Sequence, residues 1–161
     1  MPLALSLEYH VRPLGPDDRD ALAVAFSRLS PESRRRRFLG PKPALSAREL
    51  RWLTDLDHVR NEALAAVDRH GDIIAVARYH AWWERADVAD MAVAVIDEWQ
   101  GRRIGTRLSA GVVARARANG FRLVTGTTLW ENRPARKLLR RLGFRTVGAD
   151  GALLDLELAL A

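Results

Sequence analysis

The stretch from Val88 to Leu129 constrains the fold more than any other part of the chain. Its run "VADMAVAVI" predicts a strand, which we expect to be buried on both faces at its end. An amphipathic helix, "TRLSAGVVARARANG", and a second strand, "FRLVTGTTL", follow it. Strands joined through a helix pair in parallel, with a right-handed crossover. We therefore expect an α/β fold whose mixed sheet has its parallel portion here.

The flanking segments predict the antiparallel part of the same sheet. "LEYHVRPL" alternates as a strand does, and a helix is expected from there to about Leu29. "SPESRRRRFLG" and "LSARELRWL" predict helical pieces, the latter with a capping box of Ser46 and Glu49. A hairpin with its tip at Gly71, a helix in "NRPARKLLRRLGF" and an alternating tail complete the pattern. We expect one domain, residues 1–161, with a mostly antiparallel twisted sheet of about seven strands in the order β-α-α-β-β-β-α-β-α-β-β.

Composition excludes several classes of chemistry. The 161 residues include no cysteine, so disulfides, thiolate metal sites and a cysteine nucleophile are excluded. No apolar run approaches the roughly 20 residues that span a bilayer, and the N-terminal segment lacks the features of an export signal. We therefore expect a cytoplasmic protein without membrane contact. The net charge of +6 comes almost wholly from arginine, which indicates either an anionic partner or a compositional bias.

The turn "DEWQGRRIGTRL" joins the first strand of the central unit to its helix. A glycine-containing turn ahead of a helix leaves backbone N–H groups directed at one point, with the positive end of the helix dipole behind them. Gly101 and Gly105 allow a close backbone approach. Three arginines add charge there: Arg102, Arg103 and Arg107. A diphosphate therefore fits better than a carboxylate, although the spacing is equally compatible with an ordinary loop of solvated arginines.

Three separated segments resemble the GNAT superfamily of N-acetyltransferases. "QGRRIGT" is similar to the family's Q/R-x-x-G-x-G/A loop, "ADMAVAVIDEWQ" to the strand before it, and "ENRPARKLLRRLGF" to the later N-x-x-A-x-x-L-x-x-x-L-G-F helix. "LSPESRRRRF" and "LTDLDHV" further resemble the catalytic domains of bacterial Pat-type protein lysine acetyltransferases. The resemblance covers nearly the whole chain and implies a GNAT fold that takes acetyl-CoA as co-substrate. The residues implied in binding its pyrophosphate are Gln100, Gly101, Arg102, Arg103, Ile104, Gly105 and Thr106.

Two positions depart from the family pattern. Arg103 stands where the family's first loop glycine usually stands. A non-glycine residue fits there if its φ stays negative, and its charge then lies near the phosphates of the cofactor. Leu139 occupies the position at which many members carry the tyrosine that protonates the leaving thiolate, so that acid is missing from this chain.

The implied reaction needs a neutral amine, whereas an alkylammonium has a pKa of about 10.4 and is charged at neutral pH. A carboxylate near the acceptor must therefore collect a proton, directly or through water. The resemblance to Pat-type enzymes implies that Asp90 has this role, with Glu131 and Asp87 as further candidates. The alternative for Asp90 is an aspartate at a solvent-facing position of a strand.

Other cofactor contacts are implied for the backbone and for one asparagine. By the resemblance, backbone groups of Val93 and Val95 hold the thioester and the pantetheine arm, although valines there are equally typical of a buried strand. Asn132 resembles the family's asparagine that contacts the cofactor arm, and it is also the expected N-cap of the following helix. Because no cysteine can carry an acetyl group, direct transfer in a ternary complex is favoured.

The acceptor stays open in the sequence. A protein lysine fits, as does a small amine such as a polyamine or an antibiotic. An acyl-CoA sensor without turnover and a basic nucleic-acid-binding domain are further alternatives, but no basic stripe with stacking aromatic residues supports a nucleic-acid partner. We interpret the run Arg34–Arg37 as a solvated helix face. The alternatives for Trp82, Trp83 and Trp130 are the wall of an acceptor pocket, or the core or rim of the fold. The histidines are scattered, so no metal site is expected; we expect a monomer or homodimer.

Overall fold

The computed structural model describes residues 8–160, which form one seven-stranded sheet with flanking helices. The strands are Tyr9–Pro13 (β1), Asn61–Asp68 (β2), Ile73–Ala81 (β3), Val88–Val95 (β4), Leu123–Leu129 (β5), Arg145–Asp150 (β6) and Leu153–Ala159 (β7). The α-helices are Arg19–Ser27 (α2), Pro31–Phe38 (α3), Ala47–Thr54 (α4), Ile104–Ala118 (α5) and Arg133–Arg141 (α6), and the 3-10 turns are Pro16–Asp18 (η1) and Asp97–Trp99 (η2).

The strand order is β1-β2-β3-β4-β5-β7-β6, and all neighbours are antiparallel except β4 and β5. The expected mixed, mostly antiparallel sheet and its parallel portion are thereby confirmed. The last strand, β7, lies between β5 and β6, so β6 forms the edge. Three α-helices, instead of two, separate β1 from β2, because Pro31 and the irregular stretch 40–46 divide the helical sequence.

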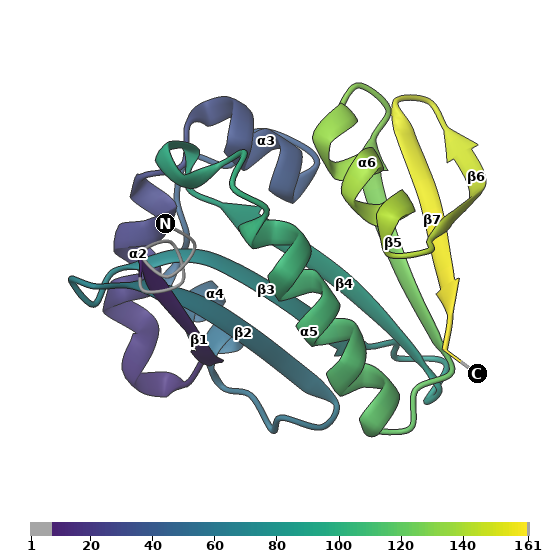
Figure 1. Cartoon of the computed structure of the whole chain (residues 1–161), viewed down its shortest axis with the longest axis horizontal. Coiled ribbons are helices and arrows are strands. Elements are labelled where there is room, and N and C mark those ends of the chain that lie inside the picture. Colours follow the sequence, from purple (N-terminus) through teal and green to yellow (C-terminus); the bar gives the residue numbers. More distant parts are fainter. Residues whose placement is uncertain (1–7, 161) are drawn as a thin grey trace.

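β4 and β5 begin as neighbours and then part. They pair only through Val88–Asp90 and Leu123–Thr125, after which β5 continues beside β7 to Leu129. Figure 1 shows the two strands converging at one end of the sheet and diverging toward the other. The first residues of β4 are buried, whereas Val93 and Val95 are only partly buried. The expectation that β4 is buried on both faces at its end was wrong, because its neighbour leaves it there.

Helices cover both faces of the sheet. α5 crosses β2, β3 and β4 on the near face in Figure 1, while α2, α3 and α4 pack against the opposite face. A Cβ atom at Gly111 would lie 2.8 Å from Leu64 Cδ1, so glycine allows α5 to approach β2 this closely. A Cβ atom at Gly105 would lie 3.2 Å from Leu138 Cδ1 of α6. The first turn of α5 and α6 thus meet beside the opening between β4 and β5.

Local sequence signals define where the helices begin. Ser46 Oγ accepts a hydrogen bond from the Glu49 amide, and the Glu49 carboxylate accepts one from the Ser46 amide, which confirms the capping box. Ser30 Oγ accepts from the Ser33 amide at the start of α3 in a similar way. Within residues 8–160, every helix is too short or too polar to cross a membrane.

Candidate active site

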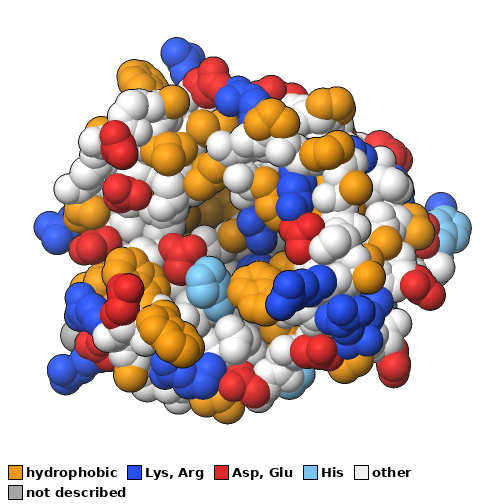
Figure 2. Space-filling view, turned by 180° about the vertical axis from the view of Figure 1, so that it is seen from behind, with side chains coloured by type: hydrophobic (Ala, Val, Ile, Leu, Met, Phe, Trp, Pro, Cys, Tyr) orange, Lys and Arg blue, Asp and Glu red, His pale blue; other side chains and the backbone are white. Residues whose placement is uncertain are grey.

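The separation of β4 and β5 opens a cleft of about 730 Å³. Its walls are the end of β4, the loop before α5, the middle of β5, α6 and part of α3. The expected cofactor residues that line it are Val93, Val95, Gln100, Gly101, Arg103, Ile104, Gly105, Thr106 and Asn132. Seen from the face opposite to α5, the molecule is hollowed near its centre, with acidic, histidine and basic side chains around the hollow (Figure 2). The fold therefore gathers nearly all of the expected cofactor residues around one cleft.

The loop that leads into α5 carries free backbone donors. The N–H groups of residues 101–106 donate to no protein atom in the described part of the chain, and α5 has no side-chain cap. Gly101 has φ +78° and Arg103 has φ +63°, so both adopt the left-handed conformation. The condition under which a non-glycine residue fits there without strain, a negative φ, is not met: the loop keeps the backbone path of a glycine, at a cost of about 1 kcal/mol. The positive end of α5 and these amides are arranged to bind an anion.

The three arginines of this loop differ in their surroundings. Arg102 lies over the ring of Trp99, 4.6 Å from its centroid, and pairs with Glu8 at 3.7 Å. Arg107 lies over a tyrosine ring. Arg103 alone of the three lines the cleft. Of this loop, only Arg103 adds positive charge at the cleft, which Arg36, Arg37, Lys137 and Arg141 also line. The side chain of Arg102, which we expected at the cofactor, is engaged elsewhere.

The side chain of Gln100 donates hydrogen bonds at the unpaired edge of β4. The backbone amide of Gln100 donates to the Asp97 carbonyl at 3.2 Å, so it is not among the free donors. Its side-chain Nε2 donates to the Val95 carbonyl at 2.9 Å and to Ser33 Oγ at 3.1 Å. Backbone groups two residues apart point to the same edge of a strand, so those of Val93 also face the cleft, where β5 has left β4. A pantetheine arm can pair with this edge as an added strand.

α6 and its N-cap contribute one polar and one apolar side chain to the lining of the cleft. Asn132 is 8% exposed, lines the cleft and caps α6, with its Oδ1 accepting from the Ala135 amide at 3.3 Å. Its side-chain nitrogen is a donor that capping does not use, so both expected roles are compatible. Leu139 also lines the cleft and packs against Gly126 of β5. Its side chain has no proton to donate to a leaving thiolate.

Asp90 lies where β4 and β5 separate, on the face away from α5. Its neighbours in the pairing are His80 of β3 and Thr125 of β5. Thr125 Oγ1 donates to Asp90 Oδ1 at 2.7 Å and accepts from Trp82 Nε1 at 3.1 Å. An indole N–H only donates, so the Thr125 proton must point at Asp90. Burial raises the pKa of Asp90, against the opposing effects of the Thr125 hydrogen bond and of the nearby His80 and Arg37.

The two further candidate carboxylates are engaged elsewhere. Glu131 pairs with Arg35 of α3. Asp87 pairs with Arg85 at 3.5 Å in the hairpin between β3 and β4. Within residues 8–160, no group of three or more His, Asp and Glu side chains is placed to hold a metal ion. Asp90 itself does not line the cleft, but it precedes Met91 and Ala92, which do, and within the described residues it is the one of the three candidate carboxylates without an ion pair.

Sequence reasoning missed the basic groups near Asp90. The side chains of Arg78 and His80 lie on the same face of β3 as Asp90 does of β4. Arg37 reaches this region from α3, on the side of the sheet that α2, α3 and α4 cover. A spacing of two between Arg78 and His80 within a strand is a signal that could have found the pair.

The expectation that Arg34–Arg37 forms a solvated helix face was only half right. Arg35 and Arg36 both pair with Glu32 of the same helix, at 3.2 Å each, as on a solvated face. Arg34 instead lies over the Phe26 ring, 4.4 Å from its centroid, and Arg37 lines the cleft. Positions three apart share a face of a helix, so one side of this charged run is turned into the protein.

Comparisons with known proteins agree with this geometry. Residues 26–144 match the model of the acetyltransferase (GNAT) family. The chain is 34% identical over 137 residues to Acetyltransferase PA5475 of Pseudomonas aeruginosa, which covers 83% of this chain and 73% of that protein. It is 28% identical over 143 residues to Acetyltransferase Pat of Mycolicibacterium smegmatis, but this covers 88% of the chain and only 43% of that protein. The chain belongs to the GNAT family of acetyltransferases, whose co-substrate is acetyl-CoA, and it is an N-acetyltransferase.

Solved structures show the same fold. The GNAT domain of S. lividans PAT superimposes with a TM-score of 0.87 at 30% identity, covering 94% of this chain and 90% of that one. The Salmonella typhimurium protein yncA, solved with its cofactor acetyl-CoA, has a TM-score of 0.73 at 16% identity and covers 96% of this chain and 95% of that one. The first similarity supports a Pat-like catalytic domain, and the second shows the fold alone.

Proposed function

We propose that this cleft transfers an acetyl group from acetyl-CoA directly to a primary amine, within a ternary complex. The observation that carries the proposal is the set of free amides of residues 101–106 at the positive end of α5, beside the unpaired edge of β4. Together they match a ligand with a diphosphate at one end and an amide-rich arm that can lie along a strand.

Each part of the co-substrate then has a partner on this chain. The amides of residues 101–106 and the Arg103 guanidinium hold the paired phosphates. Backbone groups of Val93 pair with the pantetheine arm, and Asn132 contacts it with its free side-chain nitrogen. A backbone donor on this edge stabilises the negative charge that develops on the thioester oxygen. The thioester carbon then lies where β4 and β5 separate, next to Asp90.

The chemistry requires Asp90 to act before the attack. Asp90 takes a proton from the incoming ammonium group, directly or through water, and leaves a neutral amine. The amine nitrogen forms a bond to the thioester carbon, the carbon–sulfur bond breaks, and the sulfur leaves with the electron pair. The second proton lost by the nitrogen balances the proton gained by the thiolate. A buried carboxylate with a raised pKa is suited to this exchange.

The acceptor class has two candidates. Similarity to proteins named Pat supports a protein lysine. The two basic groups beside Asp90, Arg37 and Arg78, favour a small amine that carries an acidic group. A cytoplasmic location, a single domain and a monomer or homodimer remain predictions.

A thiol-release assay with acetyl-CoA, against a panel of amines and lysine peptides, tests this function. We expect release that depends on the amine, and initial-rate lines that intersect, as a ternary complex requires. Parallel lines would indicate a covalent acetyl-enzyme and contradict direct transfer. Binding of CoA in calorimetry without any turnover would favour an acyl-CoA sensor. The matched control for the binding step is free pantetheine, which lacks the diphosphate and should bind far more weakly.

A further inference from the structure

Arg37 of α3 and Arg78 of β3 are two positive charges that form no ion pair with a carboxylate of residues 8–160. Arg78 is 3% exposed, and its one hydrogen bond runs from Nη1 to the Leu53 carbonyl at 3.2 Å. Its Nε and Nη2 are buried and have no partner within residues 8–160. The Arg37 guanidinium lies over the Phe38 ring, 4.7 Å from its centroid, and the nearby negative charge that acts on it is that of Asp90. Burial lowers the pKa of both arginines to about 10, so both still carry a charge at neutral pH.

Both guanidinium groups line one small cavity between the sheet and helices α2, α3 and α4. Its volume is about 60 Å³, larger than the roughly 15 Å³ that one water needs. The rest of its wall is apolar: Leu14, Leu22, Ala25, Phe26, Leu29, Phe38, Leu45, Leu53, Val76, Ala94 and Ile96. Leu29, Arg37 and Ala94 also line the large cleft, so the cavity adjoins it. A small polar group can therefore extend from the cleft to the two arginines.

A buried charge without a partner is unfavourable, so its presence needs an explanation. Four charged residues of the described part of the chain are no more than 8% exposed: Asp18, Glu62, Asp68 and Arg78. Each of the three carboxylates accepts hydrogen bonds from the protein. Arg78 alone keeps polar atoms without a partner. The fork of a guanidinium matches the two oxygens of a carboxylate, which would supply the missing partner.

The register of the sheet relates this pair to the proposed base. His80 lies directly opposite Asp90, and Arg78 lies opposite Ala92, two residues further along β4. Arg78 is thus a diagonal neighbour of Asp90, at a separation of about 7 to 8 Å along this face. One small molecule can place an amine at Asp90 and an anionic group at Arg78. Trp52 lies beside this pair: the Arg78 guanidinium lies over its ring, 4.6 Å from the centroid, and the His80 ring meets it edge-on at 5.8 Å.

We propose that Arg37 and Arg78 form a carboxylate-binding site on the acceptor side of the cleft, and that the acceptor is a small primary amine that carries a carboxylate. The assignment to the acceptor rests on the proposed transfer to an amine beside Asp90. The small cavity suits a compact group, and a lysine within a protein brings no carboxylate of its own. The site therefore selects a short amino acid in which a carbon chain separates the amine from the carboxylate.

The test compares δ-aminovalerate with pentylamine, which have the same carbon chain with and without a carboxylate. Wild-type protein should acetylate δ-aminovalerate with a kcat/KM about tenfold or more above that for pentylamine. Arg78→Met and Arg37→Met should bring the ratio close to one. Arg37→Lys should keep only part of it, because an ammonium group lacks the bidentate fork. Since both substrates are compared within each variant, the ratio does not depend on how much protein is folded.

The matched control is Arg48→Met, which removes an exposed arginine from the neighbouring helix α4 and should keep the ratio. Equal rates with pentylamine, or a faster rate with a lysine peptide blocked at both ends, would overturn the proposal. An Arg78-dependent preference for succinyl-CoA over acetyl-CoA would assign the carboxylate to the acyl donor and would overturn it as well.

A second measurement separates this proposal from the proposed function. Valerate, the same acid without the amine, should raise the melting temperature of the wild-type protein above that in sodium chloride of equal ionic strength. It should not do so for Arg78→Met. This result would support the carboxylate site even if no amine releases thiol from acetyl-CoA. Absence of any valerate-dependent shift in the wild-type protein would count against the site, whatever the outcome of the transferase assay.

Discussion

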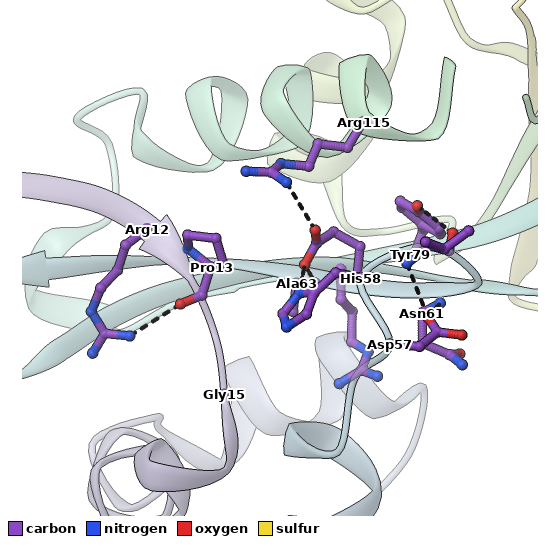
Figure 3. Close-up of polar contacts among 12 residues, drawn as sticks. Arg12, Pro13, Gly15, Asp57, His58, Asn61, Ala63, Tyr79 and Arg115 are labelled. Atoms are coloured by element: carbon purple, nitrogen blue, oxygen red, sulfur yellow. Dashed lines mark hydrogen bonds and ion pairs between the residues drawn. The ribbon is translucent and has the colours of Figure 1, made fainter. Parts of the chain in front are cut away.

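Two buried charged side chains on opposite faces of the sheet, Glu62 and Arg78, differ in how many of their polar atoms have hydrogen-bond partners. On the α5 face, Glu62 is 0% exposed and fully bonded: Oε1 accepts from the Ala63 amide at 2.8 Å and contacts His58 Nδ1 at 2.7 Å, and Oε2 accepts from Arg115 at 3.1 Å. Figure 3 shows Arg115 reaching down from α5 and His58 lying close by. On the other face, Arg78 donates one hydrogen bond to a carbonyl and has no carboxylate partner among residues 8–160.

The difference teaches how to separate structural from functional charges in this fold. A buried ion with all its bonds made holds elements together, and removing one partner is costly. A buried ion with bonds unmade lowers stability, and such groups persist where a ligand uses them. The Asp90 and Thr125 pair lies on the same face as Arg78, whereas Glu62 lies on the face of α5. We therefore expect substitutions on the two faces to affect different properties.

Among substitutions on the face of the sheet away from α5, Asp90→Asn should have the largest effect on catalysis. Loss of the base should lower kcat by about a hundredfold to ten-thousandfold, with little change in affinity for CoA. Thermal stability should be unchanged or higher, because burial disfavours the charged carboxylate. Steady-state kinetics, calorimetry with CoA and thermal melts measure the three quantities. An unchanged kcat would remove Asp90 from the mechanism.

Glu62→Ala should lower stability and leave the catalytic rate unchanged, the opposite of Asp90→Asn. It leaves the Ala63 amide and the His58 ring without their buried acceptor, so the free energy of unfolding should fall by about 3 kcal/mol or more. The kcat per folded molecule should stay the same, because the site lies on the other face. The matched variant Arg115→Met removes a side chain that is 44% exposed, but it leaves Glu62 Oε2 buried without its donor, so it should also lower stability. The loss should be smaller than for Glu62→Ala, because the Ala63 and His58 contacts to Oε1 remain. Denaturant titration checks both, and equal losses would break the comparison.

Thr125→Val should shift the pH profile and leave the fold intact. The Thr125 hydroxyl stabilises the charged form of Asp90, so its loss should raise the pKa of Asp90 further. A base works only when deprotonated, so the rising limb of kcat/KM against pH should move to higher pH. Thr125→Ser should restore the wild-type profile. Thr127→Val removes a similar bond to Asp155 two residues along and serves as the control, which should leave the limb in place.

Arg103→Gly should give the smallest effects: a small gain in stability and a small loss of CoA affinity. Glycine adopts the observed φ of +63° without strain, so stability should rise by roughly 0.5 kcal/mol after its greater freedom in the unfolded chain is counted. Loss of the guanidinium should weaken CoA binding by about threefold at low salt. Arg102→Gly is the control: it loses the contact with Trp99 and should not gain stability. If Arg103→Gly bound CoA more tightly than the wild-type protein, the arginine would contribute neither to stability nor to CoA binding.

Much of the fold could be predicted because its signals are local. Alternation, helical periodicity, the Ser46 capping box and the strand, helix, strand unit from Val88 to Leu129 all depend on neighbours in sequence, and all are confirmed. The expected burial at the end of β4 was wrong because it depends on a strand that pairs with only its first residues. No local pattern reports where two paired strands separate.

The candidate site was predicted only in part, for the same reason. Loop motifs placed the amides of residues 101–106 at the cleft, but not the left-handed φ of Arg103 or the engagement of Arg102 with Trp99. Asp90 was chosen by resemblance, and that choice stays a prediction. Its partner Thr125 lies 35 positions away and became visible only through the pairing of β4 with β5.

The sequence by itself determined the family and most of the order of the elements, and it singled out the loop of residues 100–106, since each of these signals depends on residues close together along the chain. Tertiary structure alone decided that Arg37 and Arg78, which look like ordinary surface and strand arginines in sequence, meet at one cavity. Tertiary structure also decided that the buried polar atoms of Glu62 have hydrogen-bond partners, whereas two of those of Arg78 have none within residues 8–160. The physical reason is that burial and the supply of partners are properties of packing, and packing joins residues that are distant in sequence.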